Sequence, residues 1–190
     1  PILMSAPMVR ALLEGMKTQT RRVVKPQPES GDAFDPLGQS DDPRTLESFG
    51  RCPYGVPGDR LWVREAIEQF GDQVMYSASM PFDPATSLHP DAKWPWMRNK
   101  LPSIHMPRGL SRITLDVVSV RVERVQEISE ADARAEGVEL PPTVLFPTVN
   151  TGYKLIQEYR RLWDSLNEAR GYGWSSNCFV WVVEFARRKA

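Results

Sequence analysis

The chain has 190 residues, of which 41% are hydrophobic and 25% charged, and its 24 basic and 24 acidic side chains give a formal net charge of zero. This length fits one domain, or one domain with long insertions, that buries a core without a disulfide framework or a structural metal. No apolar run is long enough to span a membrane, and the first residues carry no signal-peptide pattern. The two cysteines, Cys52 and Cys178, fit a reducing compartment. We therefore expect a cytoplasmic protein with no membrane partner.

The kind of basic residue is more informative than the net charge, because the chain has 18 arginines and 6 lysines. Arginine pairs bidentately with phosphate and stacks on bases, whereas lysine acts as a point charge. A coding bias toward arginine gives the same composition. Composition thus permits a nucleic-acid ligand without specifying one.

The first expected element is a short helix over residues 5–15, with Ser5 as its N-cap and Gly15 placed to end it. Its apolar side is expected to contain three residues: Val9, Leu12 and Leu13. Residues 20–24 then have the composition of a strand.

Residues 27–57 and 81–107 are rich in proline, glycine, serine and aspartate, and we interpret both stretches as insertions without regular structure. Between them, the sequence Pro-Gly-Asp at residues 57–59 predicts a turn that leads into a strand over residues 60–65.

The strongest strand signal covers residues 111–125. Its apolar alternation slips between Val117 and Val120, which predicts a bulge or bend of the kind found at barrel corners.

The last third of the chain is predicted to hold two helices and a final strand. Ser129 opens the first helix with a capping box, and Gly137 closes it. A third insertion at residues 140–150 leads to a helix over residues 152–167, and residues 179–185 form the closing strand. Short strands interrupted by a few helices favour a single α+β domain built on a small mixed barrel, rather than a doubly wound sheet.

The most informative polar segment is residues 15–22, Gly-Met-Lys-Thr-Gln-Thr-Arg-Arg. Alternation along the expected strand places Thr20 and Arg22 on one face, with Lys17 at the turn beside it. A lysine can activate a threonine hydroxyl if burial lowers the pKa of the lysine. The same residues can hold a phosphate without reacting, and a solvated strand edge also carries such residues. Residue chemistry alone leaves these three interpretations open.

This segment resembles the signature of the ASCH family, G-x-K-x-x-T-x-R, with Gly15, Lys17, Thr20 and Arg22 at its fixed positions. Three further segments resemble the family in the same order: residues 57–63, 128–137 and 181–185. The resemblance covers the larger part of the chain. The insertions, together with residues 102–107, resemble a subgroup common in phages and prophages.

The resemblance implies a PUA-like small mixed β-barrel with flanking helices. Some small ASCH proteins are amidohydrolases that remove the acetyl group from N4-acetylcytidine with a Lys, a Thr and a Glu, which correspond by position to Lys17, Thr20 and Glu136. In one version Thr20 attacks the amide carbonyl, Lys17 acts as its base or holds the oxyanion, and Glu136 transfers a proton. In the other, water is the nucleophile and Thr20 orients it. No cofactor is implied, and the spacing of cysteines and histidines predicts no metal site.

Further aromatic and cationic residues are candidates for binding RNA, single-stranded nucleic acid or a modified nucleoside. Such side chains stack on bases and hold phosphates. The candidates are Arg22, Arg64, Trp94, Arg98, His105, Arg108, Tyr172 and Trp174. Ordinary packing or solvent exposure is the alternative for most of them. A non-catalytic module that binds RNA, single-stranded DNA or a modified base, and a metal-independent ribonuclease, are alternative functions, and a host-protein partner stays open.

Overall fold

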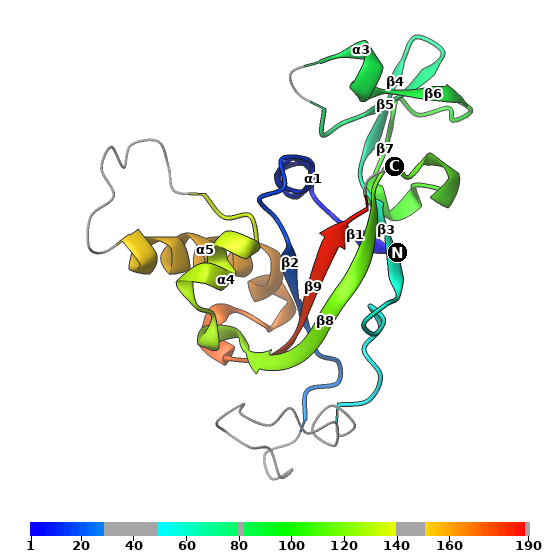
Figure 1. Ribbon diagram of the computed structural model, residues 1–190. Coiled ribbons are helices and arrows are strands. Elements are labelled where there is room, and N and C mark those ends of the chain that lie inside the picture. The colour runs from blue at the N-terminus through cyan, green and yellow to red at the C-terminus, as the bar shows by residue number, and fades with distance from the viewer. Residues whose placement is uncertain (29–48, 80–81, 140–150, 189–190) are drawn as a thin grey trace.

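The computed structural model describes residues 1–28, 49–79, 82–139 and 151–188. Within them the chain is a mixed α+β fold with two β-sheets and few helices (Figure 1), which confirms the expected α+β class. The described strands do not close into the expected small barrel. Most of the first expected insertion, and all of the insertion at residues 140–150, lie outside the described residues.

The larger sheet has five strands in the order β1-β3-β8-β9-β2. Its strands are β1 (Ile2–Leu3), β2 (Gln19–Val23), β3 (Arg60–Arg64), β8 (Thr114–Arg124) and β9 (Phe179–Arg187). The pairing of β1 with β3 is parallel and the other pairings are antiparallel. The register of β8 against β9 shifts between Val117 and Ser119. This confirms the bulge predicted from the slipped alternation, and β8 is strongly curved (Figure 1).

Strands β1 and β2 are the two edges of the larger sheet, and within the described residues no strand pairing joins them. A side chain links them instead, because Nη2 of Arg22 on β2 donates to the carbonyl of Leu3 on β1 at 2.6 Å. The larger sheet is therefore open and curved.

Helix α1 (Ala6–Leu13) lies against the first core of the protein and buries Val9 and Leu12. Leu13 is 36% exposed, which corrects its expected place on the apolar side, and Ala11 is the third buried residue. The physical reason is rotation, since each residue turns the helix by about 100° and carries Leu13 past the buried face.

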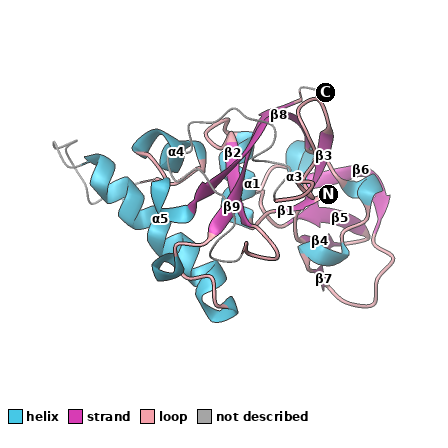
Figure 2. Cartoon of the chain, turned by 90° about the horizontal axis from the view of Figure 1, so that it is seen from below, coloured by secondary structure: helices cyan, strands magenta, loops and turns pink. Residues whose placement is uncertain are grey.

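Helices α4 (Glu130–Ala135) and α5 (Thr151–Asn167) lie together on the side of the larger sheet away from the second sheet (Figures 1 and 2). The predicted capping box is present: Oγ of Ser129 accepts from the amide of Asp132, and the Asp132 carboxylate accepts from the amide of Ser129. Three residues of α5 are fully buried: Leu155, Tyr159 and Trp163.

Strand β9 lies between β8 and β2, and its alternating side chains serve two cores. Trp181, Val183 and Phe185 belong to the core that includes α1. Val180 and Val182 belong to the core under α5. Every one of these side chains is at most 3% exposed, so β9 is the structural centre of the molecule.

A second sheet of four strands, in the order β6-β5-β4-β7, is absent from the sequence-based expectation. Its strands are β4 (Ile67–Phe70), β5 (Gln73–Tyr76), β6 (Leu88–Lys93) and β7 (Lys100–Leu101). Residues 81–107, expected to be irregular, supply β6, β7, helix α3 (Pro84–Ser87) and the 3-10 turn η1 (Ser103–His105). That expectation was wrong because β4 and β5 pair as a hairpin. The hairpin offers two free edges, and β7 pairs with β4 while β6 pairs with β5.

A buried ion pair connects the two sheets. Glu65, which is 1% exposed, accepts both Nε of Arg112 at 2.8 Å and Nη2 of Arg112 at 2.9 Å. Nη1 of Arg112 donates to Oγ of Ser79 and to the carbonyl of Thr86, and the guanidinium lies 4.0 Å from the ring centroid of Tyr76. All these contacts fix the start of β8 against the second sheet.

Two further observations concern the helices and the cysteines. Of the helices in the described ranges, none has both the length and the apolar composition needed to cross a membrane. Cys52 and Cys178 are both buried free thiols.

Candidate active site

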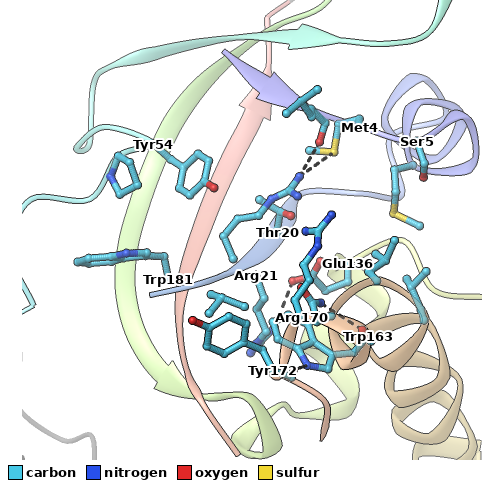
Figure 3. Close-up of a pocket in the computed structure, with 18 of the residues that line it drawn as sticks. Met4, Ser5, Thr20, Arg21, Tyr54, Glu136, Trp163, Arg170, Tyr172 and Trp181 are labelled. Carbon is cyan, nitrogen blue, oxygen red and sulfur yellow. Dashed lines mark hydrogen bonds and ion pairs between the residues drawn. The ribbon is translucent and has the colours of Figure 1, made fainter. Parts of the chain in front are cut away.

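A cavity of about 740 Å³ lies beside the two edge strands of the larger sheet (Figure 3). Leu3 of β1 and Thr20 of β2 both line it, as do the C-terminal half of α5 and the chain around Arg51. Its volume is in the upper part of the range typical of small-molecule sites, about 300–1,000 Å³.

The three predicted catalytic residues all line this cavity: Lys17, Thr20 and Glu136, here termed the floor residues. They are 3%, 4% and 4% exposed. Nζ of Lys17 donates to the backbone carbonyl of Glu136 at 2.7 Å and to Oε2 of Glu136 at 3.0 Å. The side chain of Thr20 has no hydrogen-bond partner among the described residues, and it lies in the interior of the cavity (Figure 3). A buried lysine–glutamate pair thus shares one hollow with an unengaged hydroxyl.

A close approach between α4 and the segment before β2 brings Glu136 to Lys17. Gly137 ends α4 with φ +79°, and a Cβ built on it would lie 2.9 Å from Cβ of Ala11. The amide of Thr18 donates to the carbonyl of Ala135 at 2.8 Å. Glycine is required at this position both for its backbone conformation and for the space it leaves.

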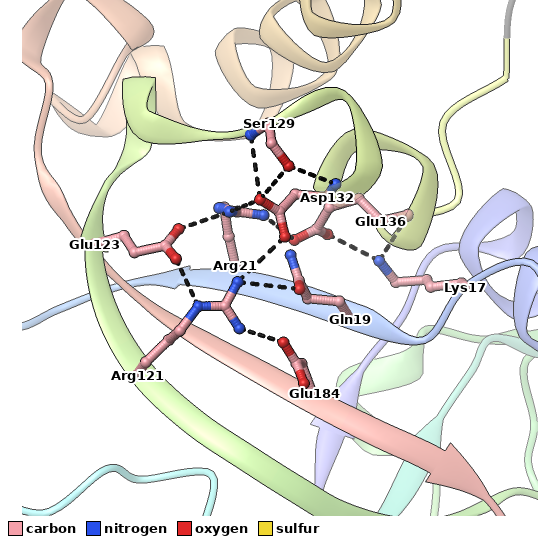
Figure 4. A network of polar contacts seen from close by, with 9 residues as sticks. All are labelled: Lys17, Gln19, Arg21, Arg121, Glu123, Ser129, Asp132, Glu136 and Glu184. Atoms are coloured by element: carbon pink, nitrogen blue, oxygen red, sulfur yellow. Dashed lines mark hydrogen bonds and ion pairs between the residues drawn. The ribbon is translucent and has the colours of Figure 1, made fainter. Parts of the chain in front are cut away.

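Arg21 fixes the other side of Glu136 (Figure 4). Its side chain is fully buried, and its guanidinium lies 2.7 Å from Oε2 of Glu123, 3.3 Å from Oδ2 of Asp132 and 3.5 Å from Oε1 of Glu136. Arg121 extends the network by contacting Glu123 and Asp132. The two oxygens of Glu136 are thus oriented by two different cations. The sequence analysis did not single out Arg21, because an arginine on a strand gives no sign of burial.

The electrostatic environment of the floor changes two proton affinities. Burial lowers the pKa of Lys17 below the ordinary lysine value, and the charge of Glu136 opposes this shift without reversing it. Burial, followed by the negative charge of Glu136, raises the pKa of Tyr159 well above its ordinary value. Lys17 is therefore closer to a neutral amine than a surface lysine is. Tyr159, which also lines the cavity, stays a protonated hydrogen-bond donor.

The more exposed part of the cavity is strongly basic. Four cations line it, here termed the rim cations: Arg22, Lys25, Arg51 and Arg170. Arg22 is half-buried and the other three are exposed. Tyr54 and Tyr172 present half-buried rings to the same space, and Nζ of Lys25 lies 5.0 Å from the ring centroid of Tyr172.

Two of the predicted binding residues, Arg22 and Tyr172, line the cavity, and Lys25, Arg51 and Arg170 were missed. These three come from the end of β2, from the chain before β3 and from the turn after α5. No local spacing relates them, so no motif could have revealed them.

Six other predicted binding residues do not line this cavity: Arg64, Trp94, Arg98, His105, Arg108 and Trp174. Arg98, His105 and Arg108 are exposed on the surface. Nη1 of Arg64 donates to the carbonyl of Ile104. Any role of these residues in binding a strand stays a prediction.

The tryptophans among those six pack against other aromatic rings. Trp94 packs edge-on against Trp96, with ring centroids 4.9 Å apart, beside the core of the second sheet. Trp174 packs against Tyr159 at 6.3 Å, in the core under α5. Their observed contacts are those of structural residues.

The carboxylates near the floor are engaged by cations. Among the described residues, no group of three or more histidines, cysteines, aspartates or glutamates is arranged to hold a metal ion. Compared with known proteins, the chain matches no family model, no curated protein and no solved structure. The chemistry of the cavity and the resemblance carried by residues 15–22 are therefore the basis for a functional proposal.

Proposed function

We propose that this chain is an ASCH-type protein with a PUA-like fold that hydrolyses the exocyclic amide of an N4-acylated cytosine, in a nucleoside or in RNA. One observation carries the proposal: the lysine and threonine of the signature and the glutamate from α4 line a single cavity, with the lysine and glutamate buried and hydrogen-bonded to each other.

The environment of Lys17 suits a general base. A neutral amine has two N–H bonds and one lone pair, and Lys17 makes two donor contacts, both to Glu136. Its lone pair is then left for a proton from Thr20 or from a water molecule. The lowered pKa of Lys17 increases the fraction of molecules in which this lone pair is free.

The reaction follows as two steps. The oxygen of Thr20, or of a water that Thr20 orients, adds to the amide carbon while Lys17 takes its proton. The carbon–nitrogen bond then breaks, and the amino group of cytosine leaves with a proton delivered through Lys17 and Glu136. If Thr20 is the nucleophile, water subsequently cleaves the acyl ester. The products are the carboxylate and the unmodified cytosine. The protonated hydroxyl of Tyr159 is available to hydrogen-bond the developing oxyanion.

The test is acetate release from N4-acetylcytidine by the purified full chain. We expect the substitutions Lys17→Met, Thr20→Val and Glu136→Gln each to lower turnover by about 10²–10⁴-fold, the usual contribution of acid–base groups. Matched controls are Lys100→Met, Thr18→Val and Glu130→Gln, which change residues of the same type that do not line the cavity. Wild-type protein that releases no acetate from the nucleoside, or from RNA carrying the modified base, would falsify the hydrolase proposal.

Thr20→Ser separates the two nucleophiles. If Thr20 attacks, the serine variant retains turnover, and rapid quenching followed by mass spectrometry detects an acyl group on residue 20. If water attacks, both proteins turn over without such an adduct.

The rim cations favour a second candidate, a non-catalytic module that binds RNA, single-stranded DNA or a modified base, because cations and aromatic faces together bind nucleic acid without any chemistry. This candidate predicts salt-dependent oligonucleotide binding that survives Lys17→Met, with no acetate released. A ribonuclease would instead cleave RNA in the presence of chelator and leave the 2′-deoxy strand intact.

A further inference from the structure

We infer that the rim cations form a phosphate-binding subsite, so that the occupant of the cavity is a nucleotide, whose base reaches the floor residues, rather than a free nucleoside. The inference rests on the proposed function for the identity of the base. The charge and position of the rim cations carry the rest.

The first argument is charge balance. The chain has a formal net charge of zero, but Glu136 is the single acidic residue among the described residues that line the cavity. Lys17 and Arg21 already pair with Glu136 at the floor. The rim cations have no carboxylate within 4.0 Å in the described part of the chain, so the outer cavity has an uncompensated positive charge. Low-dielectric walls concentrate such a field and attract an anion.

The second argument is the contrast with arginines elsewhere in the fold. Arg21, Arg112 and Arg121 are partly or fully buried, and each has a carboxylate partner within 3.0 Å. Arg22 is half-buried and lacks one among the described residues. The half-buried Arg10, Arg64 and Arg124 also lack one within the described part of the chain, but each donates to a backbone carbonyl and none lines the cavity. An arginine that is partly withdrawn from water without an anion has lost solvation that a bound phosphate would replace.

The third argument is preorganisation. Nη2 of Arg22 is fixed by the carbonyl of Leu3 at 2.6 Å, while its Nη1 has no partner within the described residues. Lys25 lies over the ring of Tyr172 at 5.0 Å, so a cation and an aromatic face are held together. Arg170 extends into the space near Thr20 and Tyr172 (Figure 3). Groups that are already ordered lose less entropy when a ligand binds.

These positions divide the cavity into two zones with different chemistry. The floor has a neutralised lysine–glutamate pair and a hydroxyl, which suits an uncharged polar base edge. The rim has four cations that lack a carboxylate partner in the described ranges, and its arginines present the planar fork that matches phosphate. A nucleoside places its base in the floor zone and leaves the rim zone without a counter-charge. A nucleotide supplies a base for the floor and a phosphate for the rim.

Isothermal titration of the full chain with the four 5′-mononucleotides and their four nucleosides tests the inference. We expect at least one mononucleotide to bind more than about tenfold tighter than its own nucleoside, with the ratio falling as salt is raised. The combined variant Lys25→Gln/Arg51→Gln/Arg170→Gln should bring that ratio close to one. The control variant Lys100→Gln/Arg134→Gln/Arg161→Gln, which removes three exposed cations that do not line the cavity, should keep the wild-type ratio.

A short oligonucleotide distinguishes the two sources of phosphate. If it binds no tighter than the best mononucleotide, the subsite takes a free nucleotide. If it binds tighter and the rim variant abolishes the gain, the subsite takes a phosphate within a strand. Two results would overturn the inference. One is that each of the four nucleotides binds with about the same affinity as its nucleoside, and the other is that the rim substitutions leave the ratio of these affinities unchanged.

The outcome is separable from that of the hydrolase proposal. If nucleotide binding depends on the rim cations but no acetate is released, the phosphate subsite is supported and the hydrolase proposal is rejected. Hydrolysis with the same KM for N4-acetylcytidine and for its 5′-monophosphate, in both wild-type and rim variant, retains the hydrolase and removes the subsite.

Discussion

The molecule contains two buried clusters of opposite charges, and they differ in how completely their polar atoms are satisfied. In the cluster between the sheets, both oxygens of Glu65 accept from Arg112, and the remaining Arg112 donor is shared by two further acceptors. In the cluster at the cavity floor, Oε1 of Glu136 and the Nε and Nη1 atoms of Arg21 are buried without a hydrogen-bond partner among the described residues, and Oε1 and Nη1 contact each other only as an ion pair at 3.5 Å.

The comparison indicates which cluster stabilises the fold and which is arranged for chemistry. A buried network whose members are all satisfied rigidifies a structure, whereas unsatisfied buried polar atoms cost free energy and call for another explanation. The floor cluster adjoins a cavity and the Glu65–Arg112 pair does not line it. We therefore expect the Glu65–Arg112 pair to contribute to stability, and the incompletely satisfied floor is where the proposed reaction would take place.

Breaking the pair between the sheets should give the largest loss of stability. Arg112→Met leaves Glu65 buried and unpaired, and we expect the free energy of unfolding to fall by about 3–5 kcal/mol. Urea denaturation followed by circular dichroism measures it. The double variant Glu65→Met/Arg112→Met should recover most of the loss because no charge is left buried. A single-variant loss under about 1 kcal/mol would contradict the structural role.

The junction of α4 with Lys17 offers a matched pair of glycine substitutions. Gly137 and Gly15 both have φ +79°, but an added Cβ meets Ala11 at 2.9 Å in the first case and nothing within 4 Å in the second. Gly15→Ala should cost about 1–2 kcal/mol for the left-handed conformation alone. Gly137→Ala should cost roughly 1–3 kcal/mol more from overpacking, and should also lower turnover by moving Glu136. Equal effects of the two substitutions on turnover would show that the close approach is unimportant.

The lowered pKa of Lys17 makes the stability of the floor depend on pH. The unfolded chain binds this proton more tightly than the folded chain, so the free energy of unfolding rises with pH from the lowered pKa up to the ordinary value of about 10.4. At pH values below the lowered pKa, Lys17 is charged in the folded protein, and its contribution to the free energy of unfolding is then least favourable.

Urea unfolding of wild-type protein and Lys17→Met between about pH 7 and pH 10 isolates this effect. Subtracting the variant removes most contributions from other groups, including that of Tyr159, whose raised pKa opposes the trend at the alkaline end in each protein alone. A wild-type stability that falls relative to the variant as the pH increases would mean that the pKa of Lys17 is raised instead.

The smallest effects are expected at exposed residues away from both clusters. Arg98→Ala and His105→Ala remove side chains that are exposed and do not line the cavity. We expect changes below about 0.5 kcal/mol in unfolding free energy. Their effect on oligonucleotide affinity tests the original prediction that these residues bind a strand.

Local signals predicted helices α1, α4 and α5 and the bulge, but not helix α3, because caps and periodicity act over a few residues. The capping box at Ser129, the glycine after α4 and the slipped alternation near Val117 each have a short-range cause. The second sheet was missed although a signal was present: Gly71 and Asp72 form a two-residue connection between β4 and β5. A Gly-Asp pair between alternating runs is typical of a hairpin.

The candidate site was predictable only as far as the signature extended. Lys17, Thr20 and Glu136 were selected by resemblance, and their shared cavity depends on the packing of α4 against β2, which spacing does not encode. Arg21 and Tyr159 acquire their importance from burial, and Arg51 and Arg170 from tertiary proximity. The chemistry of a single residue predicts neither its burial nor its tertiary neighbours, since the same residue on a surface would be solvated.

The position of β9 has a consequence for how such a protein can diversify. Trp181, in the middle of β9, lies in the core that includes α1 and also lines the cavity, so the inner wall of the cavity is part of the hydrophobic core. Lys25, Arg51 and Arg170, by contrast, lie on connecting segments outside the strands and α5, where exchanges are tolerated. Relatives or engineered versions of this scaffold can therefore change what they recognise at the entrance while retaining an unaltered interior.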